Sequence, residues 1–313
     1  MAQYTSFTMH EIENILAYFA INKIRSFKVL SGGSTNTNYL INTEKNNYVL
    51  TICEQKSDIE ARELAYILEY LEKNHFETSK VIRNTNNEPV ILWEGRPIMI
   101  KKFIDGKILR DIPHHLIELI GREIGKLHKL EIPGYLPKQL SFGKEQFVNV
   151  ENYAANSSFD VWLKEKLEYV SPYFSSNLPK AFIHGDVFCD NVIISEDESS
   201  VTILDFEESA CYFRVFDIGM MIIGICGEGK TVNLEKVRYI LKGYLQEIQL
   251  LEIELNALQA FTVYAGTAMT FWRHLNFNYT KPDSKLSNHY LGLKVLTDYV
   301  EEQPADCFIK LVK

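Results

Sequence analysis

The chain has 313 residues, 46% of which are hydrophobic, and carries a formal net charge of −8. This length and apolar content allow a large core and more than one lobe. A protein that binds a polyanion normally presents a basic face, and the sequence has no dense run of Lys and Arg. The composition therefore disfavours nucleic-acid binding.

The cysteines and the N-terminal segment indicate the compartment. The five cysteines are scattered, form no Cys-x-x-Cys pair and are odd in number, which favours a reducing cytosol over a disulfide framework. Residues 1–10 lack the basic segment and apolar run of a signal peptide. The most apolar long stretch, 215–226, is too short to span a bilayer and contains Asp217. We expect a cytoplasmic protein with no membrane partner.

The first hundred residues predict antiparallel strands and one internal helix. Thr8 and Glu11 match a capping box for a short helix that precedes the strands. Turns are expected at the glycine pair that follows Ser31 and at Asn46. The expected strands lie at 27–30, 39–41, 48–53, 90–93 and 97–103, and the expected internal helix lies at 58–73.

After Asp105 and Gly106 the pattern becomes mainly helical. Helices are expected from Pro113, over 159–169 and over most of the chain beyond 232, with two short strands at 192–194 and 201–204. These elements predict an α+β fold with two lobes. The N-terminal lobe, residues 1–104, would be an antiparallel sheet, and the C-terminal lobe, residues 105–313, would be mainly helical.

The most informative segment is His184-Gly185-Asp186-Val187-Phe188-Cys189-Asp190-Asn191, which precedes the two short strands and Asp205-Phe206-Glu207. Phosphoryl transfer needs a carboxylate that orients and deprotonates a hydroxyl, and oxygen ligands for the Mg²⁺ that bridges the ATP phosphates. We therefore predict Asp186 as the catalytic base. Asn191 and Asp205 are the predicted magnesium ligands, and Glu207 is an auxiliary ligand.

A simpler explanation exists for each of the two segments, the one with Asp186 and Asn191 and the one with Asp205. Asp186 and Asn191 would then be turn residues, and Asp205 would cap a strand. Their order across one short β-hairpin favours the catalytic interpretation. His184 is predicted to brace the loop, with Asp217 as its partner or as a helix cap.

The pattern His-x-Asp-x4-Asn followed by Asp-Phe-Glu resembles the aminoglycoside phosphotransferase/choline kinase superfamily, relatives of the protein kinases. The resemblance implies a two-lobed protein-kinase-like fold, ATP and Mg²⁺ as cofactors, and a small-molecule acceptor with a hydroxyl group. A protein kinase proper is disfavoured. Glu207 stands where protein kinases have glycine, and no Ala-Pro-Glu segment follows.

Within the superfamily, the chain is similar to homoserine kinases of the phosphotransferase-like type, which makes L-homoserine the expected acceptor. The similar segments span nearly the whole chain and lie at 7–8, 33–39, 48–51, 121–128 and 271–273. The run from 204 to 219 is closer to choline and ethanolamine kinases, because homoserine kinases usually carry Tyr in place of Glu207. Choline, ethanolamine, methylthioribose and an aminoglycoside therefore remain alternative acceptors.

The nucleotide is expected to bind the N-terminal lobe. The candidate phosphate-covering loop comprises Ser31, Gly32, Gly33, Ser34 and Asn36, because glycines let backbone N–H groups approach phosphate. Taken alone, this segment also fits an ordinary hairpin turn. Thr51 stands where kinases usually carry a Lys, and homoserine kinases of this type share it. Residues 99–104 would form the hinge, where the backbone of Lys102 and Phe103 pairs with adenine.

The candidate substrate residues are Arg273, Arg214 and Trp272. Homoserine presents a carboxylate that a guanidinium binds through two hydrogen bonds, which favours one of the arginines. Choline would instead need aromatic faces around its nitrogen. Such faces are available in a set that also fits a helical core: Phe261, Tyr264, Phe271, Trp272 and Tyr279. The sequence supports both pockets.

A hypothesis from another class is a non-catalytic nucleotide-binding protein of kinase ancestry. The absence of the strand lysine at Thr51 supports it. The intact set of Asp186, Asn191 and Asp205 opposes it.

Overall fold

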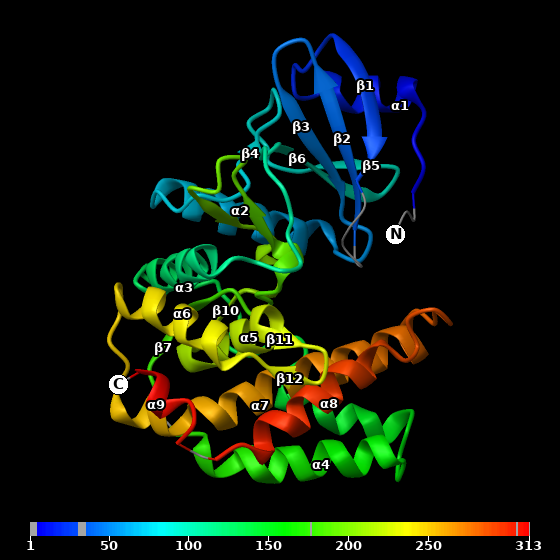
Figure 1. Cartoon of the computed structure of the whole chain (residues 1–313). Coiled ribbons are helices and arrows are strands. Elements are labelled where there is room, and N and C mark those ends of the chain that lie inside the picture. The colour runs from blue at the N-terminus through cyan, green and yellow to red at the C-terminus, as the bar shows by residue number, and fades with distance from the viewer. Residues whose placement is uncertain (1–4, 31–35, 176, 305, 313) are drawn as a thin grey trace. The chain divides into compact units, whose positions relative to one another are not determined.

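The computed structural model describes residues 5–30, 36–175, 177–304 and 306–312. The chain divides into two compact units, residues 1–106 and 107–313. The first is built mainly of strands and the second mainly of helices (Figure 1). The expected combination of an antiparallel sheet and a helical lobe is confirmed.

The first unit is an antiparallel sheet with the strand order β1-β2-β3-β6-β4, and β5 pairs with β6. The strands are β1 (Ile24–Val29), β2 (Thr37–Thr43), β3 (Asn47–Ile52), β4 (Val81–Ile82), β5 (Ile91–Trp93) and β6 (Arg96–Lys102). The helices are α1 (Met9–Ala17) and α2 (Asp58–Lys73). The expected capping box of Thr8 and Glu11 is present at the start of α1, and Ser57 and Glu60 form another before α2.

One part of the core of the first unit lies between α1 and the sheet. Ile12, Ile15 and Leu16 of α1 are fully buried and belong to one cluster with inward-facing side chains of β2, β3 and β6. This burial removes their apolar surface from water and fixes the register of the strands, because a shift by one residue would turn the apolar face outward.

The second unit contains most of the helices. They are α3 (His114–His128), α4 (Ser158–Val170), α5 (Arg214–Cys226), α6 (Leu234–Leu245), α7 (Glu252–Leu275), α8 (His289–Glu302) and α9 (Ile309–Val312). Short helical turns are η1 (Lys144–Asn152), η2 (Ser171–Tyr173), η3 (Cys189–Asn191), η4 (Phe206–Glu208) and the π-helical η5 (Asn276–Thr280).

Three two-stranded ladders complete the second unit. β7 (Lys180–Ile183) pairs with β10 (Ala210–Phe213), β8 (Val192–Ile194) with β9 (Val201–Ile203), and β11 (Gly227–Glu228) with β12 (Thr231–Val232). The β8–β9 hairpin is the one expected from the sequence. The β7–β10 pair was not expected, and it places the two segments that flank the catalytic motif side by side.

Helix α5 has the largest buried fraction of the long helices of the second unit, with eleven of its thirteen residues buried. It contacts α3, α6, α7 and α8. Its apolar composition is therefore explained by packing. Within the described residues, no helix combines the length and hydropathy needed to cross a bilayer.

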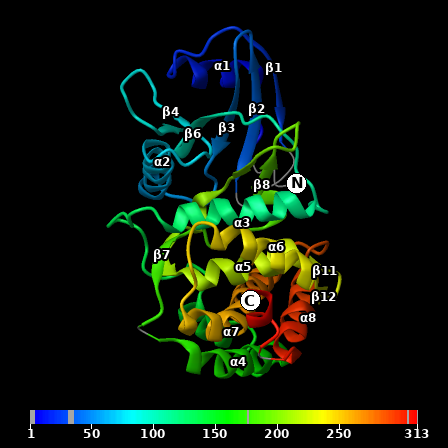
Figure 2. The ribbon, with the colours of Figure 1, turned by 60° about the vertical axis from the view of Figure 1, so that its left-hand side comes forward.

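Helices α3 and α6 lie side by side (Figure 2). Glycines at the contact allow the two backbones to approach closely. A Cβ atom built on Gly243 would lie 1.8 Å from the carbonyl oxygen of Glu118. In contrast, a Cβ on Gly292 of α8 would meet no atom within 4 Å.

We predict that Gly243→Ala lowers the free energy of unfolding by about 2–3 kcal/mol, because a methyl group forces α3 and α6 apart. Gly292→Ala is the matched control and should be neutral or stabilising by up to about 1 kcal/mol. Urea denaturation of both variants measures the difference. Equal stability of the two variants would contradict the close α3–α6 contact.

Candidate active site

The predicted catalytic loop follows β7 and leads through η3 into β8. Gly185 has φ +88°, which an L side chain rarely adopts, and this turn brings Asp186 back toward the start of β8. The Asn191 side-chain Nδ2 donates hydrogen bonds to the backbone oxygen of Asp186 at 2.8 Å and to its Oδ2 at 3.2 Å. The structure thus brings together the two residues that the sequence placed five apart.

The β8–β9 hairpin returns the chain to the loop at Asp205. The backbone N–H of Leu204 donates to the oxygen of Asn191 at 2.8 Å. Asp205 follows with φ +65°, a left-handed conformation that Asp adopts more readily than most residues. Its side chain is exposed, and its charge acts on Asp186.

Asp186 lies among negative charges. Burial, together with the negative charges of Asp205, Glu208 and Asp190, raises the pKa of its carboxyl to about 8, against the opposing charge of Arg273. The loop therefore concentrates negative charge around one partly exposed carboxyl group.

His184 braces this loop, as expected. Its Nε2–H donates to the oxygen of Leu204 at 2.7 Å, and its Nδ1 accepts the N–H of Asp186 at 3.1 Å. The side chain is fully buried, and burial lowers the pKa of the imidazole. Because both ring nitrogens are engaged, the neutral ring is a structural link between Asp186 and the residue before Asp205.

Asp217 is a partner of His184, as predicted, and the contact is with the backbone N–H of that residue. Its carboxylate accepts the backbone N–H groups of His184 at 2.6 Å and Gly185 at 2.7 Å, so it holds the loop backbone and leaves the His184 ring to other partners. His128 Nε2 lies 3.1 Å from the same carboxylate, and His128 Nδ1 lies 2.9 Å from the hydroxyl of Tyr244. Helices α3, α5 and α6 thus meet at the loop through one buried carboxylate.

The two candidate arginines have different surroundings. Arg214 pairs with the buried carboxylate of Glu254 through Nε at 2.6 Å and Nη2 at 2.5 Å. It follows Phe213, which pairs with Lys180 at the start of β7, whereas the catalytic loop follows the other end of that strand. Arg214 is therefore a structural residue, and its prediction as a substrate residue is corrected.

Arg273 faces the catalytic loop. Its guanidinium lies 5.4 Å from the ring centroid of Phe188, and its Nη1 lies 3.4 Å from His289 Nε2. Burial lowers the pKa of this guanidinium, while the charges of Asp186 and Asp190 oppose the shift. Within the described chain, no carboxylate lies within ion-pair distance of Arg273.

The aromatic residues suggested for a choline pocket belong mostly to the core. Phe261, Tyr264 and Phe271 are at most 1% exposed, so they cannot surround a ligand. Trp272 is partly exposed and packs edge-on against Phe277 at 5.6 Å between centroids. Tyr279 is exposed and packs on Tyr153.

The predicted nucleotide-binding residues lie in the first unit. Ser31, Gly32, Gly33 and Ser34 fall outside the described residues, and Asn36 is buried just before β2. Thr51 is buried, and its hydroxyl donates to Asn38 Oδ1 at 2.7 Å across the β2–β3 ladder.

The hinge prediction changes in one respect. The backbone N–H of Lys102 donates to Lys80 at 2.8 Å, and that of Phe103 donates to Asn47 at 3.1 Å. Neither N–H group is available to adenine. Any adenine donor in this segment has to come from the residues after Phe103.

The donor set of the second unit fits a magnesium ion that substrate helps to bind. In the described part of the chain, no three His, Cys, Asp or Glu side chains are grouped closely enough to hold a metal. Asn191 and Asp205 supply the oxygen ligands that Mg²⁺ prefers, and Mg²⁺ usually keeps waters and phosphate oxygens in its remaining positions. The excess of carboxylates around Asp186 also favours a cation.

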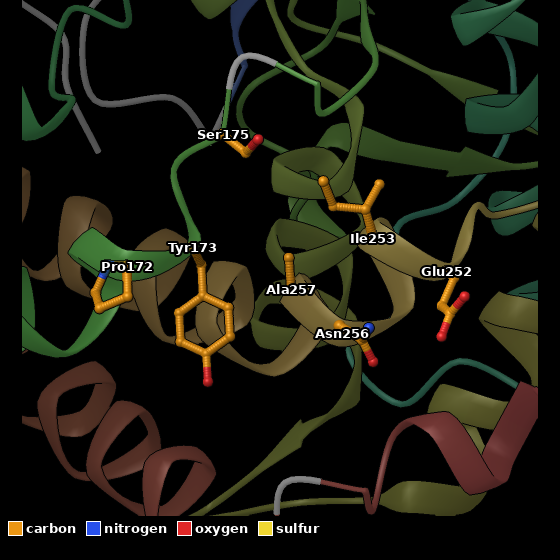
Figure 3. Close-up of a pocket in the computed structure, with 7 residues that line it drawn as sticks. All are labelled: Pro172, Tyr173, Ser175, Glu252, Ile253, Asn256 and Ala257. Carbon is orange, nitrogen blue, oxygen red and sulfur yellow. The ribbon is translucent and has the colours of Figure 1, made fainter.

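Two surface cavities are lined by residues outside this loop. One, of about 370 Å³, lies between the segment after α4 and the first turns of α7, as Figure 3 shows, where Tyr173, Glu252 and Asn256 supply polar groups. The other, of about 400 Å³, lies in the first unit, and Lys102 and Phe103 contribute to its lining. No residue of the catalytic loop lines either cavity.

Comparison with known proteins establishes the family. The phosphotransferase enzyme family matches residues 26–248, and the chain belongs to this family. The match confirms the resemblance predicted from the catalytic motifs and the assignment of the chain as an enzyme that phosphorylates a small molecule.

Curated relatives and solved structures extend this result. The homoserine kinase of Zymomonas mobilis subsp. mobilis is 25% identical over 307 residues, which cover 91% of this chain and 92% of the relative. The homoserine kinase of Paramagnetospirillum magneticum is 27% identical over 298 residues, which cover 90% of each. A choline/ethanolamine kinase family protein from Mesorhizobium loti superposes with a TM-score of 0.70 at 15% identity, over 97% of this chain and 99% of that one. The last likeness confirms the fold.

We predict that Asp217→Asn lowers the free energy of unfolding by about 1–3 kcal/mol, because an amide places an NH₂ group against buried backbone donors. Glu235→Gln, at an exposed position in α6, is the control and should change stability by less than about 0.5 kcal/mol. Urea denaturation monitors both variants. A stable Asp217→Asn variant would show that the loop backbone does not depend on this carboxylate.

Proposed function

We propose that this chain is an ATP- and magnesium-dependent kinase that phosphorylates the side-chain hydroxyl of L-homoserine. The observation that carries the choice of acceptor is Arg273, a partly buried guanidinium beside the catalytic loop with no carboxylate partner in the described chain. A partly buried charge without an ion pair is unfavourable, so this arginine is suited to an anionic group of the substrate.

The charge of Arg273 distinguishes the alternative acceptors. Homoserine brings a carboxylate that a guanidinium binds through two parallel hydrogen bonds. Choline, ethanolamine and aminoglycosides are cations without a carboxylate, and Arg273 would repel them. The relatives named homoserine kinase, similar over most of the chain, support the same acceptor.

The proposed reaction uses Asp186 as the base. Asn191 Nδ2 donates to Oδ2 of Asp186, which orients the carboxylate and leaves Oδ1 for the substrate hydroxyl. As the hydroxyl oxygen bonds to the γ-phosphorus, its proton passes to Asp186. The bond from the γ-phosphorus to the bridging oxygen of ADP breaks, and ADP leaves.

Asn191 and Asp205 are the proposed magnesium ligands, with Glu207 as an auxiliary ligand two residues further along η4. The ion would neutralise charge on the ATP phosphates. His184 supports this arrangement, because its ring links the backbone N–H of Asp186 to the carbonyl oxygen of Leu204, the residue before Asp205.

In the first unit, Ser31, Gly32, Gly33, Ser34 and Asn36 remain the proposed phosphate-covering segment. Lys102 and Phe103 remain part of the proposed hinge, where they can offer carbonyl oxygens or side-chain contact to adenine. Trp272 is a proposed wall of the acceptor pocket, because it is partly exposed and adjoins Arg273.

A coupled ADP-release assay with Mg·ATP tests the acceptor. We expect saturable turnover with L-homoserine, much weaker turnover with choline, ethanolamine and an aminoglycoside, and loss of turnover when EDTA removes the metal. Turnover with choline or ethanolamine alone would replace the acceptor and keep the catalytic assignment. Nucleotide binding without ADP formation across the whole panel would identify a non-catalytic protein.

Asp186→Asn should lower kcat roughly 10²-fold or more, because the amide cannot accept the hydroxyl proton. The matched control is Glu196→Gln, an exposed acid in the β8–β9 turn, which should retain wild-type kcat. Circular dichroism confirms that both variants are folded. Near-normal turnover by folded Asp186→Asn would remove this residue from the role of base.

A further inference from the structure

Arg273 is held in place on two sides. The Phe188 ring lies beneath its guanidinium, and His289 Nε2 accepts from its Nη1–H at 3.4 Å. Because His289 accepts with Nε2, its neutral ring carries the proton on Nδ1. Two supports from different elements, the catalytic loop and the first residue of α8, limit the orientations of the guanidinium.

Asp190 is the second unpaired charge at this place. It is exposed, and in the described chain its carboxylate makes no hydrogen bond or ion pair with another side chain. Its charge acts on Arg273, on His289 and on Asp186. It caps no helix, since η3 starts without a side-chain cap. Among the described residues, Asp190 therefore has no side-chain partner, and its carboxylate is available to a ligand.

We propose that Asp190 and Arg273 form a receptor for the zwitterionic head of an amino acid. Arg273 binds the α-carboxylate, Asp190 binds the α-ammonium, and Phe188 and His289 are positioning residues that orient Arg273. This inference rests on the proposed function and adds the residues that select the acceptor.

The arrangement matches the shape of homoserine. Two methylene groups separate its α-carbon from the hydroxyl, so the groups that bind its head must lie close to the base. Asp190 is four residues from Asp186 on the same loop, and Arg273 is an electrostatic partner of both acids. One cation and one anion together are complementary to a zwitterion, whereas an acceptor that carries only an amine leaves Arg273 unpaired.

Acceptors that lack one charged group test the two proposed contacts separately. L-homoserine carries both, 4-hydroxybutyrate lacks the ammonium, and 3-amino-1-propanol lacks the carboxylate. We expect Asp190→Asn to lower kcat/KM for homoserine roughly 10- to 100-fold and to leave that for 4-hydroxybutyrate within about threefold. Arg273→Gln should show the converse, with homoserine impaired and 3-amino-1-propanol unaffected. Glu196→Gln is the control for both.

The positioning role of His289 is tested by comparing the KM for homoserine with the KM for ATP. His289→Ala should raise KM for homoserine roughly tenfold and leave KM for ATP unchanged, while His289→Gln, which retains an acceptor for Arg273, should restore part of the loss. Equal changes in both KM values, or no change, would remove His289 from this role.

The outcomes distinguish the receptor from the function. If the wild-type enzyme phosphorylates homoserine and Asp190→Asn impairs homoserine and 4-hydroxybutyrate equally, Asp190 does not bind the ammonium and the receptor is wrong while the function stands. If the wild-type enzyme phosphorylates no hydroxy amino acid, the proposed function and the receptor both fail.

Discussion

The buried carboxylate of Asp217 is the interaction on which the catalytic loop depends. It accepts the backbone N–H groups of His184 and Gly185, and it lies within hydrogen-bond distance of His128. Buried backbone donors need partners, so this one side chain determines where the loop leaves β7. Because Asp217 belongs to α5, a helix with eleven of its thirteen residues buried, the position of Asp186 is tied to the core of the unit. Two further hydrogen bonds fix the rest of the loop: Asn191 donates to Asp186, and the His184 ring donates to Leu204.

Much of the site follows from sequence because it is local. The spacing of Asp186 and Asn191 fixes their hydrogen bond, and the short β8–β9 hairpin returns Asp205 to the loop without any distant contact. The capping box of Thr8 and Glu11 and the β5–β6 hairpin are local in the same sense. Each of these features depends on residues close together in the chain, so the sequence pattern largely determines the local structure.

The features that the sequence left open depend on distant contacts. The sequence offers Arg214 and Arg273 equally as ligands for a carboxylate. Only the ion pair of Arg214 with Glu254, forty residues away, shows that Arg214 has a structural role. The Phe103 N–H is engaged by Asn47, which no hinge pattern reveals. Asp217 was expected to be the partner of His184 or a helix cap, and only the structure shows that it binds the backbone of the loop while the His184 ring donates to Leu204. The β10 strand, Ala-Cys-Tyr-Phe, has no alternation of apolar and polar residues in its sequence, although its burial alternates, so its pairing with β7 was not expected.

In the second unit, the residues that support the loop and the residues proposed for catalysis differ in how their polar groups are paired. The structural network of Asp217, His128 and Tyr244 is buried, with each member bonded to another. The groups around Asp186 differ: several carboxylates lie near one another, and the partly buried guanidinium of Arg273 has no ion pair in the described chain. Folding alone does not favour such an arrangement, since uncompensated charge in a partly buried region destabilises the native state. The accumulation of negative charge around Asp186, and the lack of an ion pair for Arg273 in the described chain, are understood if a metal, phosphates and the charged head of a substrate bind here.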